Sequence, residues 1–217
     1  AVLNIFENHY DESIPLFNEA LKIHRKGNKR KAVLGSIYDF FYGLMLLRHR
    51  SLTNLKQLDQ YMQLFIGKNN VISPVNAILY DALYVYQGIK KIEESRYLST
   101  KRESPYESLV QILLLYWLDE TKRISSPLQQ STFLAPLAHH CQQAHDVGFG
   151  WYAAISATLL QRLNYTNKAC EKIAKNYENE SFIHLVDAFP KSVAWERALE
   201  ALSQISTLKP QSTEIAA

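Results

Sequence analysis

The sequence has 217 residues, of which 47% are hydrophobic, and a formal net charge of +3. This length supports one domain or one continuous array that buries roughly 70% of the surface of its unfolded chain. A net charge this small argues against a dedicated nucleic-acid-binding protein, which is usually strongly basic. The sequence has only seven glycines and seven prolines, and this low content favours long helices.

The first predicted helix begins near Asp11. Ile14, Phe17 and Leu21 recur at steps of three and four residues, which indicates one apolar stripe along an amphipathic helix. Gly27 and the asparagine after it are typical helix stop signals, so we expect this helix to end there.

Apolar residues recur with a helical period in eight further stretches, separated by short loops rich in glycine, proline and asparagine. The predicted helices cover residues 31–48, 55–66, 74–94, 105–123, 132–147 and 151–163, a short stretch that ends near 177, and 192–205. No stretch alternates with a period of two, and no Asn-Gly or Asp-Gly hairpin turn occurs. The sequence therefore predicts an all-α fold of about nine or ten helices.

Residues 7–23 resemble the second helix of a tetratricopeptide repeat (TPR). The matching positions are the aromatic and small residues Tyr10, Ser13, Phe17 and Ala20. The resemblance implies a TPR-like right-handed array of antiparallel helix pairs, an α-solenoid, with residues 2–6 as the last turn of a preceding helix. Arg25 replaces the proline that closes such a repeat, and later helices lack the spacing, so we expect a degenerate array.

Residues 19–47 and 185–202 resemble the helical region upstream of the motor in bacterial Swi/Snf-type helicase-like ATPases. This resemblance implies a non-catalytic segment of a larger DNA-dependent ATPase. The motor motifs themselves are absent, since the chain has neither a G-x-x-x-x-G-K-[ST] loop nor an Asp-Glu-x-His sequence. We expect residues 1–208 to form a single helical-repeat domain, a fragment of a larger protein, and residues 209–217 to form a disordered tail.

A basic turn follows the first predicted helix. Its five cations are Arg25, Lys26, Lys29, Arg30 and Lys31. They could contact the phosphates of DNA or RNA, or an acidic partner. The alternative is a solvated turn whose cations stabilise the helix C-terminus before it.

Aromatic residues are frequent in the middle of the chain, where Tyr80 and Tyr84 lie one helical turn apart. Together with Trp117 and Trp151 they could line a groove for a protein partner, because tyrosine and tryptophan are enriched at interfaces. The alternative is packing between helices, with the hydroxyl groups at the rim of the core.

Histidines and a cysteine cluster in residues 139–145, where Cys141 and His145 share a helical face. Zinc needs three or four ligands, and no Cys-x-x-Cys supplies the rest, so we predict no metal site. A Cys–His nucleophile would also lack an orienting acid. We therefore predict no catalytic residue and no cofactor.

Two cysteines, Cys141 and Cys170, are too few for a disulfide framework and favour reduced thiols in a cytoplasmic protein. The longest apolar runs, 110–118 and 40–47, are too short for a membrane span of about 20 residues.

The predicted function is a non-enzymatic protein-interaction or regulatory helical module of a Swi/Snf-type ATPase. Its partner would be another protein or the adjacent motor domain. The alternatives are a nucleic-acid-contacting accessory domain that uses the basic turn, and a small all-α hydrolase with a deep polar pocket.

Overall fold

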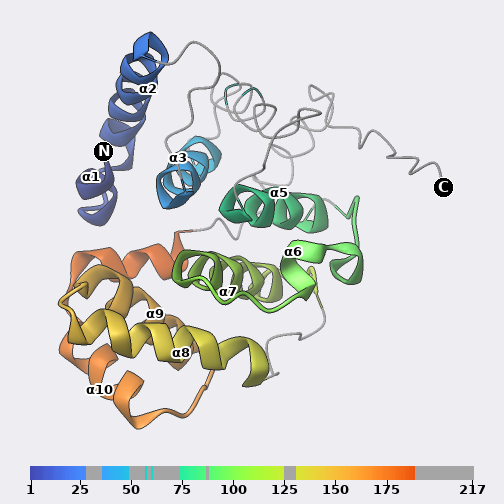
Figure 1. Cartoon of the computed structure of the whole chain (residues 1–217), viewed down its shortest axis with the longest axis vertical. Helices are drawn as coiled ribbons and strands as arrows, with labels where there is room; N and C mark the ends of the chain where they lie inside the picture. The colour runs from blue at the N-terminus through green and yellow to red at the C-terminus, as the bar shows by residue number, and fades with distance from the viewer. Residues whose placement is uncertain are drawn as a thin grey trace.

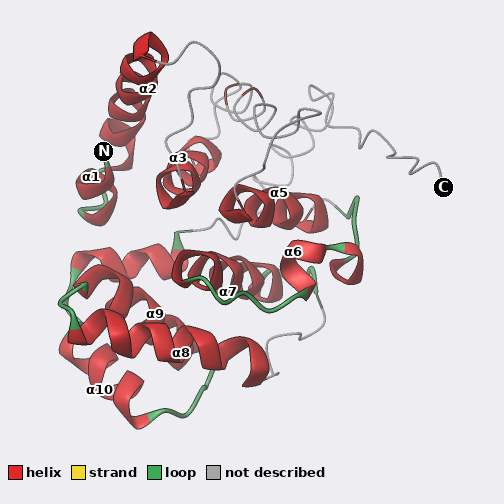
Figure 2. Ribbon diagram, in the orientation of Figure 1, coloured by secondary structure: helices red, strands yellow, loops and turns green. Residues whose placement is uncertain are grey.

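The computed structural model describes residues 1–27, 36–48, 57, 60, 74–86, 88–124 and 131–188. Within these residues the chain forms nine α-helices and two 3-10 helices and no strand (Figure 2). The all-α prediction is thereby confirmed. The predicted helices at 55–66 and 192–205 and the predicted tail at 209–217 lie outside the described residues, apart from positions 57 and 60.

The elements follow one another along the chain as a series of short helices (Figure 1). They are α1 (Val2–Phe6), α2 (Tyr10–Gly27), α3 (Ser36–Arg48), α5 (Pro74–Tyr86), η1 (Ile92–Glu94), α6 (Arg96–Ser99), α7 (Pro105–Glu120), α8 (Ser131–Asp146), α9 (Gly150–Arg162), α10 (Lys168–Asn176) and η3 (Ser181–Asp187).

Local sequence signals explain several of these ends. Pro105 begins α7, where its missing N–H has no partner to lose. The side chain of Asn167 caps α10 and accepts hydrogen bonds from the backbone N–H groups of Ala169 and Cys170, both at 3.1 Å.

The prediction of one long helix over 74–94 was wrong, because α5 ends at Tyr86. Gly88 follows with φ +71°, a left-handed conformation that ends the helix. The chain then turns back, and Lys90 Nζ forms an ion pair with Asp81 Oδ1 at 2.9 Å. Ser95, the N-cap of α6, also donates a hydrogen bond to Asp81. Past Tyr86, Ile92 packs partly against the core while Ile89 is 50% exposed, so the helical spacing of these residues does not reflect a continued helix.

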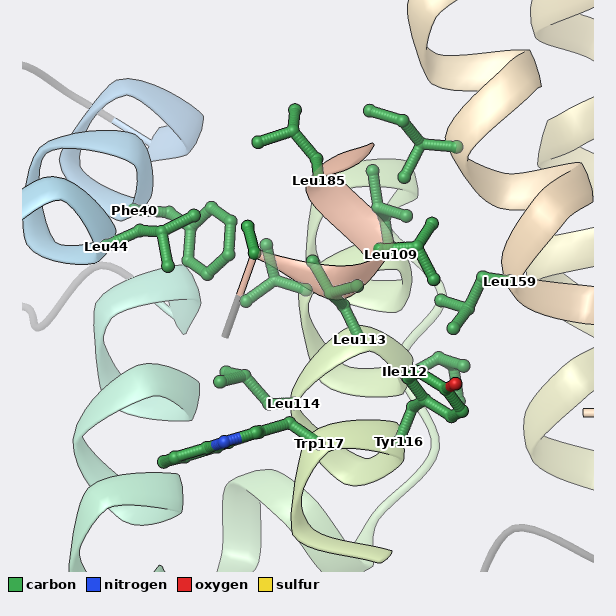
Figure 3. Packing of buried hydrophobic residues seen from close by; sticks show 14 of the residues in the cluster. Phe40, Leu44, Leu109, Ile112, Leu113, Leu114, Tyr116, Trp117, Leu159 and Leu185 are labelled. Atoms are coloured by element: carbon green, nitrogen blue, oxygen red, sulfur yellow. The ribbon is translucent and has the colours of Figure 1, made fainter. Parts of the chain in front are cut away.

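Helix α7 lies at the centre of the described part of the molecule, and every residue from 108 to 118 is buried. Figure 3 shows Phe40 and Leu44 of α3 approaching α7 from one side and Leu159 of α9 approaching it from the other. This arrangement explains why residues 110–118 are almost all apolar and show no amphipathic stripe, because a helix covered on all sides needs no polar face. The interpretation of 110–118 as a buried helix segment is confirmed.

The packing order mostly follows the chain order, since each described helix contacts its neighbour, as in α1–α2, α2–α3, α5–α7, α7–α8, α8–α9 and α9–α10. Some contacts depart from this order, such as that of α8 with α10, and one of them joins the two ends of the described chain. The 3-10 helix η3 packs on α1 and α9, and the imidazole Nε2 of His184 donates a hydrogen bond to the carbonyl of Ile5 at 3.0 Å. Segments almost 180 residues apart in the sequence therefore lie side by side.

Candidate functional site

A cavity of about 470 Å³ lies between the start of α7, the second half of α8 and the start of α9, and it opens to solvent. Its described lining is mainly apolar and aromatic. The lining residues are Pro105, Tyr106, His140, Gln143, Ala144, Val147, Phe149 and Tyr152. We call this cavity the aromatic pocket.

The turn between α8 and α9 forms the mouth of the aromatic pocket. Gly148 has φ +76°, and the backbone N–H of Phe149 donates to the carbonyl of Ala144 at 2.7 Å, which closes the end of α8. This tight turn holds Val147 and Phe149 outward, with 79% and 36% of their surfaces exposed. Two apolar side chains therefore meet solvent at the entrance of an apolar cavity.

Stacked rings form the wall of the pocket. The rings of Phe149 and Tyr152 lie 6.1 Å apart with an angle of 13° between their planes, and Tyr106 approaches Tyr152 edge-on at 6.2 Å. Trp151 lies behind this wall and contacts both Tyr106, at 6.4 Å, and Phe6 of α1, at 5.4 Å. The wall is therefore supported by rings from α1, α7 and α9.

The two tyrosines of the wall are neutral phenols. Burial raises the pKa of Tyr152 and, with a smaller effect from the nearby Tyr38, also raises the pKa of Tyr106. The hydroxyl group of Tyr152 donates to the carbonyl of Pro105 at 2.7 Å, which ties α9 to the first residue of α7. These phenols therefore serve as apolar surface and as hydrogen-bonding groups, not as bases.

His140 supplies the polar edge of the pocket. Its Nε2 lies 2.7 Å from the carbonyl oxygen of Glu103, which can only accept, so Nε2 carries a proton. The other ring nitrogen, Nδ1, lies 3.4 Å from the side-chain oxygen of Gln143. None of the described lining residues is a carboxylate or a thiol.

The four aromatic residues of the predicted groove lie in different surroundings. Tyr80 and Tyr84 contact each other on α5, with ring centres 4.4 Å apart, and Tyr84 is buried. Trp117 is 2% exposed and stacks on Tyr86 at 4.5 Å. Trp151 lies behind the wall of the aromatic pocket. Tyr84 and Trp117 are thus buried, and a groove for a protein partner formed by these four residues stays a prediction.

The basic turn is described only in part. The backbone of Arg25 and Lys26 forms the end of α2, while Lys29, Arg30 and Lys31 lie outside the described residues. Contact with nucleic acid or with an acidic partner therefore stays a prediction.

The cluster at 139–145 is split between core and surface. Cys141 is fully buried and His139 is exposed, while His145 Nδ1 lies 3.4 Å from the hydroxyl group of Tyr177. A hydrogen bond with Cys170 and burial raise the pKa of Cys141, which keeps its thiol protonated. In the part of the chain that the structure describes, no three His, Cys, Asp or Glu side chains converge as a metal site would require.

Sequence reasoning missed Tyr106, His140, Gln143 and Phe149 as pocket residues. One local signal was present, since glycines on both sides of Phe149 indicated a tight joint that could present this ring. The other three residues carried no signal, because the helices α7 and α8 are brought together only by folding.

Fold and pocket together define an all-α protein with an open aromatic cavity. No protein-family model, no curated protein and no solved structure matches the chain. None of the described helices is both long and apolar enough to cross a membrane.

Proposed function

We propose that this chain is a non-enzymatic protein-interaction module whose aromatic pocket receives an apolar side chain of a partner segment. The observation that carries the proposal is the exposure of Val147 and Phe149 at the mouth of an apolar cavity of about 470 Å³. Single exposed apolar residues are common, but a pair at the entrance of an apolar cavity forms a continuous patch.

The size and lining of the pocket suit an anchor side chain. Cavities of roughly 300–1,000 Å³ with apolar walls and a few polar groups are typical of binding sites. Interfaces place one or two aromatic or aliphatic anchors in such pockets, where burial yields about 25 cal/mol per Å² of apolar surface. His140 and Gln143 at the edge would orient the partner through hydrogen bonds.

The lining favours docking over the small hydrolase that the sequence left open. Acid–base or nucleophilic catalysis needs a carboxylate, an activated hydroxyl or a thiol beside a base. The described lining offers one histidine, whose Nε2 proton is held by the carbonyl of Glu103, and two neutral phenols.

The proposal extends to the architecture, a TPR-like right-handed array of antiparallel helix pairs. Packing of each helix on its neighbour supports it, because repeat arrays are built from such nearest-neighbour contacts. The contact of η3 with α1 is a departure that a regular solenoid lacks.

The proposed setting is the cytoplasmic, helical, non-catalytic part of a Swi/Snf-type DNA-dependent ATPase. It is supported only by the resemblance of residues 19–47 and 185–202. In that setting the occupant of the pocket is a segment of a protein partner or of the adjacent motor domain.

Binding of indole, followed by NMR, tests the pocket, because indole reproduces an aromatic anchor. We expect amide shifts confined to the pocket residues, and roughly tenfold weaker binding in Phe149→Ala, equivalent to about 1.4 kcal/mol. The matched control is Ile89→Ala, which truncates an equally apolar residue that is 50% exposed and does not line the pocket. Equal affinity in all three proteins would contradict the proposal.

A second step separates a protein partner from a small molecule. Peptides selected from a random library on the whole chain should carry an aromatic or aliphatic anchor and should displace indole. If indole binds but no selected peptide competes with it, the pocket is a small-molecule site and the docking function is wrong.

A further inference from the structure

The two cysteines of the chain lie side by side although 28 residues separate them in the sequence. Cys141 of α8 and Cys170 of α10 are 0% and 2% exposed, and the two helices pack on each other. The thiol of Cys141 donates to the carbonyl oxygen of Ala153 at 3.3 Å. The thiol of Cys170 also lies 3.8 Å from the carbonyl oxygen of Ala138, one turn before Cys141 on the same helix. Both cysteines are free thiols.

We propose that Cys141 and Cys170 are a redox modification site, at which a hydroperoxide drives formation of a reversible disulfide between α8 and α10. The contact between two helices, rather than the presence of a single cysteine, carries this proposal. Nothing in the docking function depends on it.

The two thiols differ in their readiness to react. The contact with Cys141 lowers the pKa of Cys170, whereas the same contact and burial raise the pKa of Cys141. A thiolate is the attacking form of cysteine, so Cys170 reacts first and Cys141 is the resolving residue.

The reaction balances with one hydroperoxide. The Cys170 thiolate attacks the hydroperoxide oxygen, so that an S–O bond forms, the O–O bond breaks and an alcohol, or water from hydrogen peroxide, leaves with the thiol proton. The Cys141 sulfur then displaces the hydroxyl group of the sulfenic acid, which leaves as water with the second thiol proton. Two thiols lose two electrons, and these electrons reduce one hydroperoxide. A reducing thiol reverses the modification by exchange.

The structure also provides a route to the buried pair. Helix α10 has nine residues, most of which are exposed, and it packs on α8 and α9. Short helices at the edge of a domain open locally more readily than the core. Opening of α10 admits an oxidant as small as hydrogen peroxide, and oxidation then holds α10 on α8. Because α8 also contributes His140 and Gln143 to the aromatic pocket, the disulfide is anchored on a helix that lines the pocket.

Mass spectrometry of the whole chain after treatment with hydrogen peroxide tests the proposal. We expect the mass to fall by two hydrogen atoms, a non-reducing digest to contain one peptide that joins Cys141 to Cys170, and dithiothreitol to restore the original mass. Amide hydrogen exchange in α10 should slow in the oxidised protein.

The variants Cys141→Ala and Cys170→Ala are the matched controls. Cys141→Ala should gain oxygen at Cys170 instead of losing hydrogen, whereas Cys170→Ala should keep Cys141 reduced. If a variant folds poorly, the test still stands, because the peptide that joins Cys141 to Cys170 is measured in the unmodified chain. The proposal is overturned if the unmodified chain only gains oxygen, if both thiols stay free, or if the cross-link joins two different chains.

Discussion

At the scale of single residues, buried hydroxyl groups connect elements of this fold that apolar packing alone would leave free to slide. Tyr152 is the clearest case, since its ring belongs to the pocket wall while its hydroxyl group reaches the backbone of α7. Buried polar groups of this kind contribute little free energy but specify one register between helices.

Replacement of Tyr152 by phenylalanine should lower the free energy of unfolding by about 1 kcal/mol at neutral pH, because the hydrogen bond to Pro105 is lost. The effect also depends on pH. The folded protein raises the pKa of Tyr152, so the unfolded chain loses this proton first as the pH rises. The contribution of the phenol is therefore complete below the ordinary tyrosine pKa of about 10 and declines at higher pH.

Urea unfolding at pH 8 and at pH 11 measures this difference. The gap between the unmodified chain and Tyr152→Phe should narrow at pH 11. Tyr38→Phe is the control, because Tyr38 is 52% exposed, and its effect should stay within about 0.5 kcal/mol at both pH values. If the difference in unfolding free energy between the two proteins is constant or grows with pH, the phenol of Tyr152 is not the group that causes it.

At the scale of elements, the ends of helices are decided by backbone conformation as much as by apolar pattern. Helix α5 ends before Gly88 because a left-handed residue there reverses the chain and brings Lys90 back to Asp81. The short helix α10 begins through a different device, the side-chain cap of Asn167. Both devices are local, and both set where the next element begins.

Gly88→Ala should destabilise the fold by about 1 kcal/mol, because a Cβ is strained at φ +71° even though no neighbour lies within 4 Å of it. Gly150→Ala is the contrasting variant. Gly150 is helical, and a Cβ there meets Tyr177 at 3.4 Å, an ordinary contact, so alanine should be neutral or slightly stabilising. Thermal unfolding of both variants measures the contrast, and equal effects would show that strain at Gly88 is not the cause.

At the scale of the whole molecule, contacts between distant segments convert a row of helices into one body. Helix α7 is enclosed by its neighbours, and η3 returns to α1 through the hydrogen bond between His184 and Ile5. The formal net charge of the sequence is +3, and five cations cluster at 25–31 in the basic turn.

The alternative function, contact with nucleic acid, makes a prediction at this scale. If the basic turn binds phosphates, the affinity for duplex DNA should fall steeply between 50 and 200 mM salt, as is typical of such contacts. The triple variant with Lys29, Arg30 and Lys31 changed to alanine should bind more weakly and with a shallower salt dependence. A second triple variant removes the same charge elsewhere and is the control. It changes three lysines of α10 to alanine, namely Lys168, Lys172 and Lys175. If the unmodified chain shows no salt-sensitive binding, this alternative is wrong.

Much of the fold was predictable from the sequence, because helical periodicity is a local property. The run at 110–118 indicated a buried helix, and the stripe of Ile14, Phe17 and Leu21 indicated an amphipathic one, with all three residues buried on α2. The prediction failed at 88–94, where apolar residues kept the helical spacing but belong to a turn and the short 3-10 helix η1 instead.

The sequence by itself determined that this chain is helical and where most of the described helices lie, since hydrogen bonds within a helix and the spacing of apolar residues depend on neighbours within a few positions. Only the tertiary structure decided which residues meet. Tyr106, His140 and Phe149 come from three separate segments, and Cys141 meets Cys170 across two helices. Such contacts depend on how helices orient and pack, and the pattern along one helix carries no information about the partner that covers it.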